Sequence, residues 1–369
     1  MAAGRQQPTY RRADAPQSPV IWIVGILVLL IMGMIVFLFL GNARGSDVPP
    51  DDGTIADGAA PSEQRVSFVA VGDNLPDITL ASYADACAGV PDDGLYDYNP
   101  LYRPIKPYIE AADLAYIDFE THAGGNDIGP RGYPSFNTTD TMVDAVYDTG
   151  FDLIASATNH CYDWGQSALD HSRALWMQKP VLFAGTASTP EEAAVIPTRE
   201  KNGIVFSFLN YTYGVNGYQE EDIPSWAVNY MHEDRIREDV ARARESSDVV
   251  IVAMHWGTEN LTEADENQRS YAQILADSGA DLVLGSHPHV IGPVEWVEGS
   301  QGNKTLVAYS LGNFISHHET PDYLNELEGM LQCEFVKDQG TVRIENVAWV
   351  PLVNHSEEGA YAVYPLKDY

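Results

Sequence analysis

Short apolar runs alternate with amphipathic segments along the chain after residue 65. Continuous stretches of Val, Ile, Leu and Phe are typical of strands that are buried on both faces of a sheet. They predict strands over residues 66–71, 113–118, 151–155, 201–210, 248–254, 281–284 and 304–309. Segments with helical periodicity lie between them, at residues 138–149, 164–178, 232–247 and 268–278. This alternation predicts α/β layers, with a closing antiparallel pair at residues 330–336 and 341–350.

The ends of two predicted helices carry capping signals. Thr139 or Asp140 is a plausible N-cap for the helix over residues 138–149. Gly279 follows the helix over residues 268–278 and is expected to cap its C-terminus. Residues 74–110 and 211–230 are long insertions that contain Tyr and Pro, and loops of this length are usually functional or mobile.

Residues 20–40 form an uncharged apolar stretch near the N-terminus. Its length matches the roughly 20 residues that span a bilayer core. Arg5, Arg11 and Arg12 precede the stretch, whereas acidic residues such as Asp51 follow it. Positive charge stays on the cytoplasmic side. We therefore expect a cytoplasmic segment over residues 1–19, a single-pass anchor over 20–40, a flexible linker over 41–64 and an extracytoplasmic domain over 65–369 in the cell membrane.

Net charge and cysteine content narrow the range of functions. The 369-residue chain carries a formal net charge of -32. Nucleic acid is therefore excluded as a partner, because phosphate binding needs a basic face. The acidity itself is accounted for by solubility. Three cysteines permit at most one intrachain disulfide, and their spacing matches no metal motif.

Residues of metal-binding type follow five of the predicted strands. They are Asp73, Glu120, Asn159 with His160, His255, and His287 with His289. In a parallel sheet the carboxyl ends of the strands lie at one edge, so these side chains are expected to converge. Pro288 stiffens the turn between the last two histidines. Carboxylates, an amide and imidazoles together suit two divalent cations, and the imidazole pair suits Zn, Mn or Fe.

The chain resembles the CapA family of poly-γ-glutamate and capsule synthesis proteins, which are related to calcineurin-like metallophosphoesterases. Nine short stretches within residues 66–315 carry the resemblance in the family's order. They are Val71-Gly72-Asp73, Asp118-Phe119-Glu120, Tyr133-Pro134-Ser135-Phe136-Asn137, Gly150-Phe151-Asp152, Thr158-Asn159-His160, Asp163-Trp164-Gly165, His255-Trp256-Gly257-Thr258-Glu259, Gly285-Ser286-His287-Pro288-His289-Val290 and Tyr309-Ser310-Leu311-Gly312-Asn313-Phe314.

The resemblance implies a two-sheet α/β sandwich, flanked by helices, with a two-metal site. It implies that Asp73, Glu120 and His289 hold one ion. The other ion would be held by Glu120, Asn159, His255 and His287. His160 stands where the phosphoesterases keep the acid that protonates the leaving group.

The sequence departs from the related phosphoesterases at two positions. Leu75 stands where they place a histidine, so the first metal site is one ligand short. Asp118 stands where CapA proteins usually have Asn, and it either adds a ligand or caps a turn; we favour the turn. Arg131 is a candidate for binding a substrate anion, because a guanidinium pairs bidentately with carboxylate or phosphate. Asn137 is a second candidate for substrate binding, whereas His122, His317 and His318 either face the substrate or are solvated.

Three functions are open at this point. The first is a membrane-anchored protein in the synthesis or attachment of an acidic surface polymer, with a hydrolase-like metal site that cleaves a phosphoester or an amide. The second is a non-catalytic subunit of a membrane synthase that binds polyanion or acts as a scaffold. The third is a secreted phosphatase or nucleotidase. The first predicts the lipid bilayer, an acidic polymer or its precursor, and other synthase subunits as partners.

Overall fold

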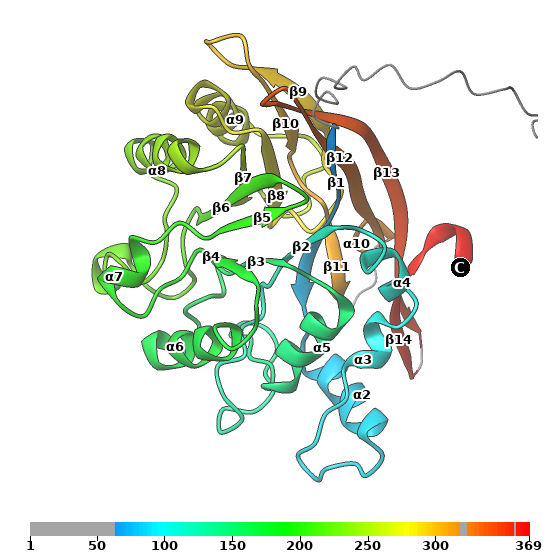
Figure 1. Cartoon of the computed structure of the whole chain (residues 1–369). Helices are drawn as coiled ribbons and strands as arrows, with labels where there is room; N and C mark the ends of the chain where they lie inside the picture. The colour runs from blue at the N-terminus through cyan, green and yellow to red at the C-terminus, as the bar shows by residue number, and fades with distance from the viewer. Residues whose placement is uncertain (1–62, 318–322, 358) are drawn as a thin grey trace, which may run out of the picture. The chain divides into compact units, whose positions relative to one another are not determined.

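The computed structural model describes residues 63–317, 323–357 and 359–369 (Figure 1). The predicted cytoplasmic segment, the predicted anchor over residues 20–40 and all but the last two residues of the predicted linker lie outside these ranges. Within these ranges, no helix combines the length and the apolar character that crossing a bilayer requires. The domain begins with β1 at Gln64, two residues before the predicted strand.

The first sheet is built around β1 (Gln64–Leu75). On one side of β1 lie three parallel strands, β2 (Leu114–Asp118), β3 (Leu153–Ala155) and β4 (Leu182–Ala184). On its other side lie three antiparallel strands, β12 (Leu327–Asp338), β13 (Thr341–Glu357) and β14 (Ala360–Pro365). The short strand β11 (Asn313–Ser316) pairs in parallel with the carboxyl end of β1.

The second sheet has a parallel centre and antiparallel edges. Its order is β5 (Thr198–Lys201), β6 (Ile204–Thr212), β7 (Val249–His255), β8 (Leu282–Ser286), β10 (Lys304–Ala308) and β9 (Val294–Glu298). Strands β6, β7, β8 and β10 run parallel, whereas β5 and β9 run antiparallel to their neighbours. The prediction of α/β layers in two sheets is therefore confirmed.

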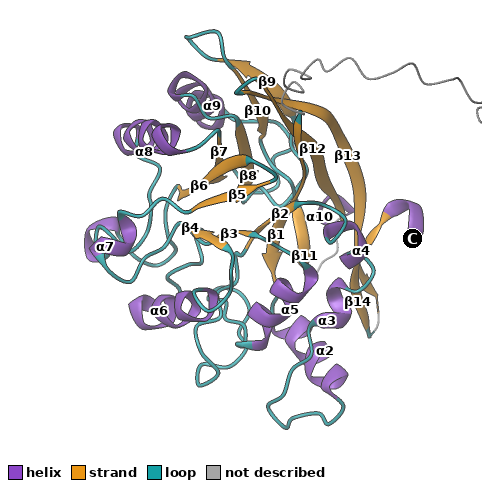
Figure 2. Ribbon diagram, viewed as in Figure 1, coloured by secondary structure: helices purple, strands orange, loops and turns teal. Residues whose placement is uncertain are grey.

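Helices cover the outer faces of the sheets, as Figure 2 shows. The first sheet is covered by helices that include α2 (Ile78–Ala88), α3 (Asn99–Tyr102), α4 (Lys106–Ile109), α5 (Thr141–Thr149) and α6 (Gly165–Trp176). The second is covered by α8 (Glu233–Ser246) and α9 (Glu266–Ser278). The remaining short elements are α7 (Pro190–Ala193), α10 (Tyr323–Glu326), η1 (Glu220–Asp222) and η2 (Leu366–Asp368).

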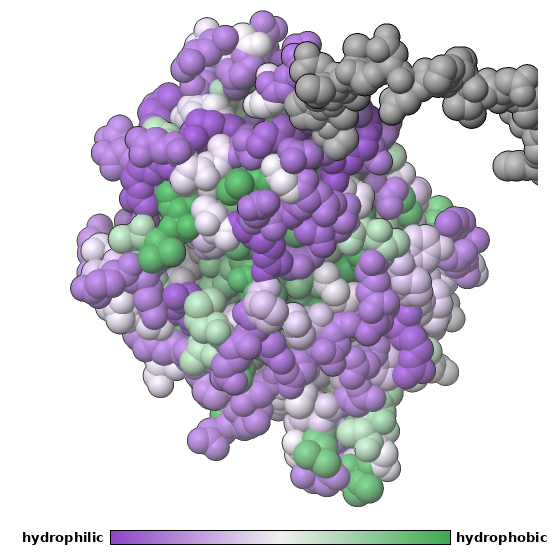
Figure 3. Space-filling view, viewed as in Figure 1, coloured by the Kyte–Doolittle hydropathy of each residue, from purple (hydrophilic) through white to green (hydrophobic). Residues whose placement is uncertain are grey.

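Side chains alternate along β1 between two apolar layers. Phe68 and Ala70 point into the core between the sheets, where Phe335 packs edge-on against Phe68 and Phe206. Val69 and Val71 point the other way, into the core beneath the helices. This period of two is the geometry of a strand that is buried on both faces. The visible surface, by contrast, is largely hydrophilic (Figure 3), in keeping with the charge of the chain.

The structure corrects some local predictions and confirms others. The insertion at residues 74–110 is not one loop, because it contains helices α2, α3 and α4. Asp140 is the N-cap of α5, but neither it nor Thr139 caps the helix through its side chain. Gly279 caps α9 in the left-handed conformation, as predicted. All three cysteines are free.

Candidate metal centre

The predicted ligands lie where the carboxyl ends of the two sheets meet. Asp73 is near the end of β1 and Glu120 follows β2, whereas His255 ends β7 and His287 follows β8. The edge is therefore shared by two sheets and is not that of a single parallel sheet. Within the first sheet, Gly72 lets β1 approach the residue that precedes β11, because a Cβ at Gly72 would lie 1.8 Å from the Gly312 carbonyl oxygen.

The candidate side chains form one connected cluster. Potential ligand atoms of Asp73, Glu120 and His289 lie within 4.8 Å of one another, and so do those of Glu120, His255 and His287. The amide oxygen of Asn159 lies 2.9 Å from His255 Nε2. The predicted convergence of the six residues is confirmed, and their role as ligands stays a prediction.

Glu120 is the shared member of the cluster and has no hydrogen-bond partner among the described residues. Its side chain is fully buried, and neither carboxylate oxygen accepts a hydrogen bond. Burial raises the pKa of Glu120 to about 7, although the charge of His289 opposes the shift. The nearest imidazole nitrogens lie 3.7 Å and 3.9 Å away, on His255 and His289. Because a buried carboxylate without a hydrogen bond is costly, the position fits a group that a bound cation neutralises.

The histidines divide into two electrostatic classes. Burial lowers the pKa of His287 to about 3 and that of His255 well below its usual value, so both present neutral imidazoles, the form that binds metals. Burial also opposes the charge of His289, but the carboxylates of Glu120 and Asp73 outweigh it and raise the pKa of His289 to about 10. The carboxylates of Asp73 and Glu120 therefore favour a positive charge beside them. This donor set fits a divalent cation.

The turn that carries His287 and His289 is strained and fixed. Both residues have positive φ, 93° and 59°, which non-glycine residues seldom adopt. The backbone N–H of His287 donates to Asp73 Oδ2 at 3.2 Å, and the backbone N–H of Asn260 donates to the Pro288 carbonyl at 2.8 Å. Such strain persists where the surrounding structure holds it in place, and here it directs two imidazoles to one site.

Asp118 has a different position from the one we predicted. It is the last residue of β2 and is buried, and its carboxylate accepts no backbone hydrogen bond in the described chain, so it caps no turn. Its Oδ2 lies 3.3 Å from His255 Nδ1. Neither atom makes a hydrogen bond in the described chain, so this contact is a close approach only. The Nε2 atom of the same ring faces Asn159 and Glu120. Potential ligand atoms of Asp73, Asp118 and His255 lie within 4.8 Å of one another, and the predicted alternative that Asp118 adds a ligand stays a prediction.

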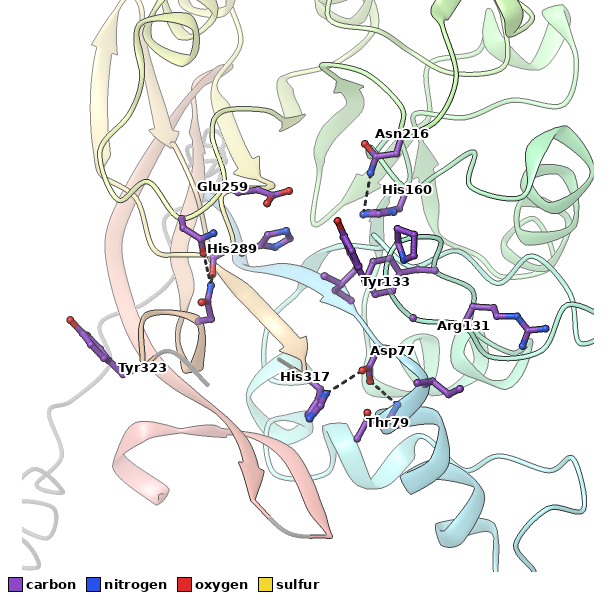
Figure 4. Close-up of a pocket in the computed structure, with 17 residues that line it drawn as sticks. Asp77, Thr79, Arg131, Tyr133, His160, Asn216, Glu259, His289, His317 and Tyr323 are labelled. Atoms are coloured by element: carbon purple, nitrogen blue, oxygen red, sulfur yellow. Dashed lines mark hydrogen bonds and ion pairs between the residues drawn. The ribbon is translucent and has the colours of Figure 1, made fainter. Parts of the chain in front are cut away.

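His160 lies in the wall of a cleft of about 1330 Å³ that opens over the cluster. Its Nδ1 lies 2.8 Å from Asp163 Oδ2, and its Nε2 lies 3.4 Å from the Asn216 amide nitrogen. The Phe136 ring packs edge-on against the imidazole. Figure 4 shows His160 across the cleft from His289 and Glu259. His160 is absent from the candidate metal groups in the described chain.

The other polar candidates have different surroundings. Arg131 lines the cleft, but its guanidinium points away from His160 (Figure 4) and lies 5.9 Å from the Trp164 ring. Asn137 is buried, and its amide joins Gly124 to Gly129, so the structure gives it a loop-bracing role in place of the predicted contact with substrate.

The histidines outside the predicted ligand set also differ from one another. His122 is buried against the Ser156 carbonyl, so it is neither solvated nor in the cleft. His317 lines the cleft and pairs with Asp77 at 3.1 Å. His318 lies outside the described residues. Leu75 lines the cleft at the position of the missing histidine.

Sequence reasoning assigned no role to four residues around the site. Asn313 Oδ1 lies 3.0 Å from His289 Nδ1, and Asp163 pairs with His160. The Tyr213 ring packs 4.7 Å from that of His287, and Glu259 lies beside His287 and His289. Asn313, Asp163 and Glu259 lie inside the stretches that resemble CapA proteins, and this position could have identified them as candidate site residues. No feature of the sequence pointed to Tyr213.

The chain belongs to the family described as bacterial capsule synthesis protein PGA_cap, which it matches over residues 67–318. It is 28% identical over 252 residues to the PGA biosynthesis protein CapA of Bacillus subtilis, covering 67% of this chain and 64% of that protein. It is 24% identical over 232 residues to the capsule biosynthesis protein CapA of Bacillus anthracis, covering 60% and 54%. The chain thus matches less than two thirds of the length of either relative.

Two solved structures show a more distant likeness. A phosphatase from Mycoplasma pneumoniae aligns with a TM-score of 0.47 and 12% identity, over 78% of this chain and 94% of that one. The calcineurin-like phosphoesterase YfkN from Bacillus subtilis aligns with a TM-score of 0.43 and 14% identity, over 78% and 90%.

Proposed function

We propose that this protein is a membrane-anchored, extracytoplasmic hydrolase that uses two divalent cations in the synthesis or attachment of an acidic capsule polymer. The observation that carries the proposal is Glu120, a fully buried carboxylate without a hydrogen-bond partner in the described chain, surrounded by three histidines beneath an open cleft. Membership of the capsule synthesis family supports the polymer as the biological context.

Each residue of the cluster has a task in this proposal. Asp73, Glu120 and His289 hold one cation, and Glu120, Asn159, His255 and His287 hold the other. Bound cations of the Mn, Fe or Zn type supply Lewis-acid polarisation of a phosphoryl or carbonyl group and lower the pKa of water. Asp118, whose Oδ2 lies 3.3 Å from His255 Nδ1, adds a ligand.

His160 serves as the proton donor to the leaving group. Its contact with Asp163 fixes Nδ1, which leaves Nε2 directed towards Asn216 in the cleft wall. A positioned imidazole of this kind contributes about 10²–10⁴-fold to a rate.

The charges of the cleft bear on the choice between hydrolysis and binding. Its wall carries the carboxylates of Asp77 and Glu259 and a single guanidinium, that of Arg131. Because the described cleft residues supply few cations, an anionic polymer would have to be bound through the metal centre in hydrolysis and in scaffolding alike. The turnover test below decides between the two functions. A relative is named as a PGA biosynthesis protein, and poly-γ-glutamate contains amide bonds; an amide is therefore the first scissile bond to test.

The membrane location rests on the sequence. The apolar stretch over residues 20–40 and the arginines before it support an N-in anchor. If residues 41–64 form the linker that we propose, its root-mean-square reach would be roughly 25–30 Å. In this proposal the domain works near the membrane surface, within reach of synthase subunits and of the growing polymer.

The test uses the full-length chain loaded with Mn²⁺. Hydrolysis of poly-γ-glutamate, of γ-glutamyl p-nitroanilide and of bis(p-nitrophenyl) phosphate is measured for the wild type, Glu120→Ala and His160→Ala. The proposal predicts turnover of at least one substrate, which both substitutions remove while circular dichroism stays unchanged. Metal-dependent polymer binding without turnover would establish the scaffold function instead.

A further inference from the structure

The candidate centre is uneven in its supply of ligands. Asp73, Glu120 and His289 would hold one of the proposed ions. Leu75 stands where the related phosphoesterases place a further histidine, and its buried aliphatic side chain offers no donor atom. Carboxylates and imidazoles on the neighbouring strands already serve the rest of the cluster. A further donor on this side would therefore come from a loop at the cleft mouth.

Glu259 lies at the cleft mouth beside one histidine of each proposed ion. Potential ligand atoms of Glu259, His287 and His289 lie within 4.8 Å of one another. In Figure 4 the Glu259 carboxylate lies beside the His289 imidazole and extends into the cleft. Glu259 is exposed, unlike its two histidine neighbours. A carboxylate there reaches the buried cluster from the solvent side.

Backbone contacts hold the Glu259 loop against the histidine turn. The backbone N–H of Asn260 donates to the Pro288 carbonyl at 2.8 Å. The Asn325 side chain donates both to Asn260 Oδ1, at 3.3 Å, and to the His289 carbonyl, at 3.1 Å. These hydrogen bonds tie the loop to the turn at Asn260, the residue that directly follows Glu259.

A second observation points to a ligand at the same place. His287 Nδ1 is buried and has no hydrogen-bond partner among the described residues. His287 belongs both to the group with Glu120 and His255 and to the group with Glu259. An imidazole nitrogen left unpaired in a buried setting is costly unless something binds it.

We propose that Glu259 is an additional metal ligand, which acts together with His287 and His289 and binds from the mouth of the cleft. The inference rests on the proposed function, because it requires that the cluster binds divalent cations. Glu259 is exposed, whereas the other proposed ligands are buried. Its carboxylate can therefore dissociate from a bound ion and rebind it without disturbing the packing of the two sheets.

The experiment compares the full-length wild type with Glu259→Gln, Glu259→His and Glu263→Gln. Glu263 is exposed on the same loop and belongs to none of the candidate metal groups in the described chain, so its replacement controls for the loss of a nearby charge. Mn²⁺ affinity is measured by calorimetry and Co²⁺ coordination by visible absorption. Melting temperatures in EDTA show whether every variant remains folded.

We expect Glu259→Gln to weaken binding of one Mn²⁺ by at least about 10-fold, since loss of even an indirect partner of a metal ligand costs 10–100-fold. The Co²⁺ spectrum changes with it, whereas Glu263→Gln matches the wild type and Glu259→His regains affinity through its imidazole. Wild-type affinity and spectrum in both Glu259 variants would overturn the inference alone. A wild type that binds neither ion would overturn the proposed metal centre, and this inference with it.

Discussion

Replacing Glu120 by Gln is expected to stabilise the metal-free protein while it destroys the metal centre. The carboxylate is fully buried without a hydrogen-bond partner among the described residues, and burial raises its pKa from 4.5 to about 7. One pKa unit corresponds to about 1.4 kcal/mol, so the charged form costs the folded, metal-free protein about 3 kcal/mol. Asp73 lies 2.9 Å from His289 Nδ1 and keeps that imidazolium paired in the variant.

The pH dependence follows from the direction of the shift. The folded state binds the Glu120 proton more tightly than the unfolded state does, so wild-type stability falls relative to the variant as pH rises from about 4.5 to about 7. In EDTA the free energies of unfolding should nearly agree at pH 4.5. At pH 8 the variant should exceed the wild type by up to about 3 kcal/mol.

Metal should offset most of this difference. At a free concentration 100 times the dissociation constant, a cation stabilises the native state by about 2.7 kcal/mol. We expect this gain in the wild type and not in Glu120→Gln. The assay is urea unfolding at pH 4.5 and pH 8, each in EDTA and in Mn²⁺, followed by circular dichroism.

Glu328→Gln is the matched control. Glu328 is also buried and burial raises its pKa well above the usual value, but it belongs to none of the candidate metal groups in the described chain. Its variant should keep the Mn²⁺ gain. The reasoning would be refuted if Glu120→Gln were less stable than the wild type in EDTA at pH 8, or if Mn²⁺ stabilised it as much as the wild type.

Three further predictions concern the ligands, their support and the membrane. His289→Ala should lose bound metal, whereas His160→Ala should keep it and lose about 10²–10⁴-fold in turnover; equal metal loss, measured by elemental analysis, would make His160 a ligand. Asp118→Asn should lower metal affinity about 10–100-fold by calorimetry with little change in fold, and an unchanged affinity would remove its role as a ligand. Protease added to intact cells should cleave the chain after residue 65, and protection until the membrane is opened would reverse the proposed topology.

The apolar strands were predictable because burial on both faces imposes continuous Val, Ile and Leu runs. Strand β7 (Val249–His255) and strand β8 (Leu282–Ser286) are examples. Strands β4 and β11, of three and four residues, were not predicted. Length alone is not the reason, because β3 also has three residues and was predicted from the segment over residues 151–155. The division into two sheets came from the family resemblance, since the same apolar runs also suit one parallel sheet.

The site was predictable where donors follow strong strands and unpredictable where loops supply them. The positions of Asp73, Glu120 and His255 follow from the strands that precede them. Asn137 has a side-chain type that suits both substrate binding and loop bracing, and only its contacts with Gly124 and Gly129 decide between these roles. The place of Glu259 depends on the hydrogen bonds that tie its loop to the histidine turn.

The central claim is that the buried cluster holds two divalent cations. Metal content per chain, measured by inductively coupled plasma mass spectrometry on the full-length wild type and Glu120→Gln after reconstitution with Mn²⁺ and removal of free metal, tests it most directly. The account predicts close to two ions in the wild type and fewer than one in the variant. A wild type that retains no stoichiometric metal, or a variant that retains as much as the wild type, would contradict it.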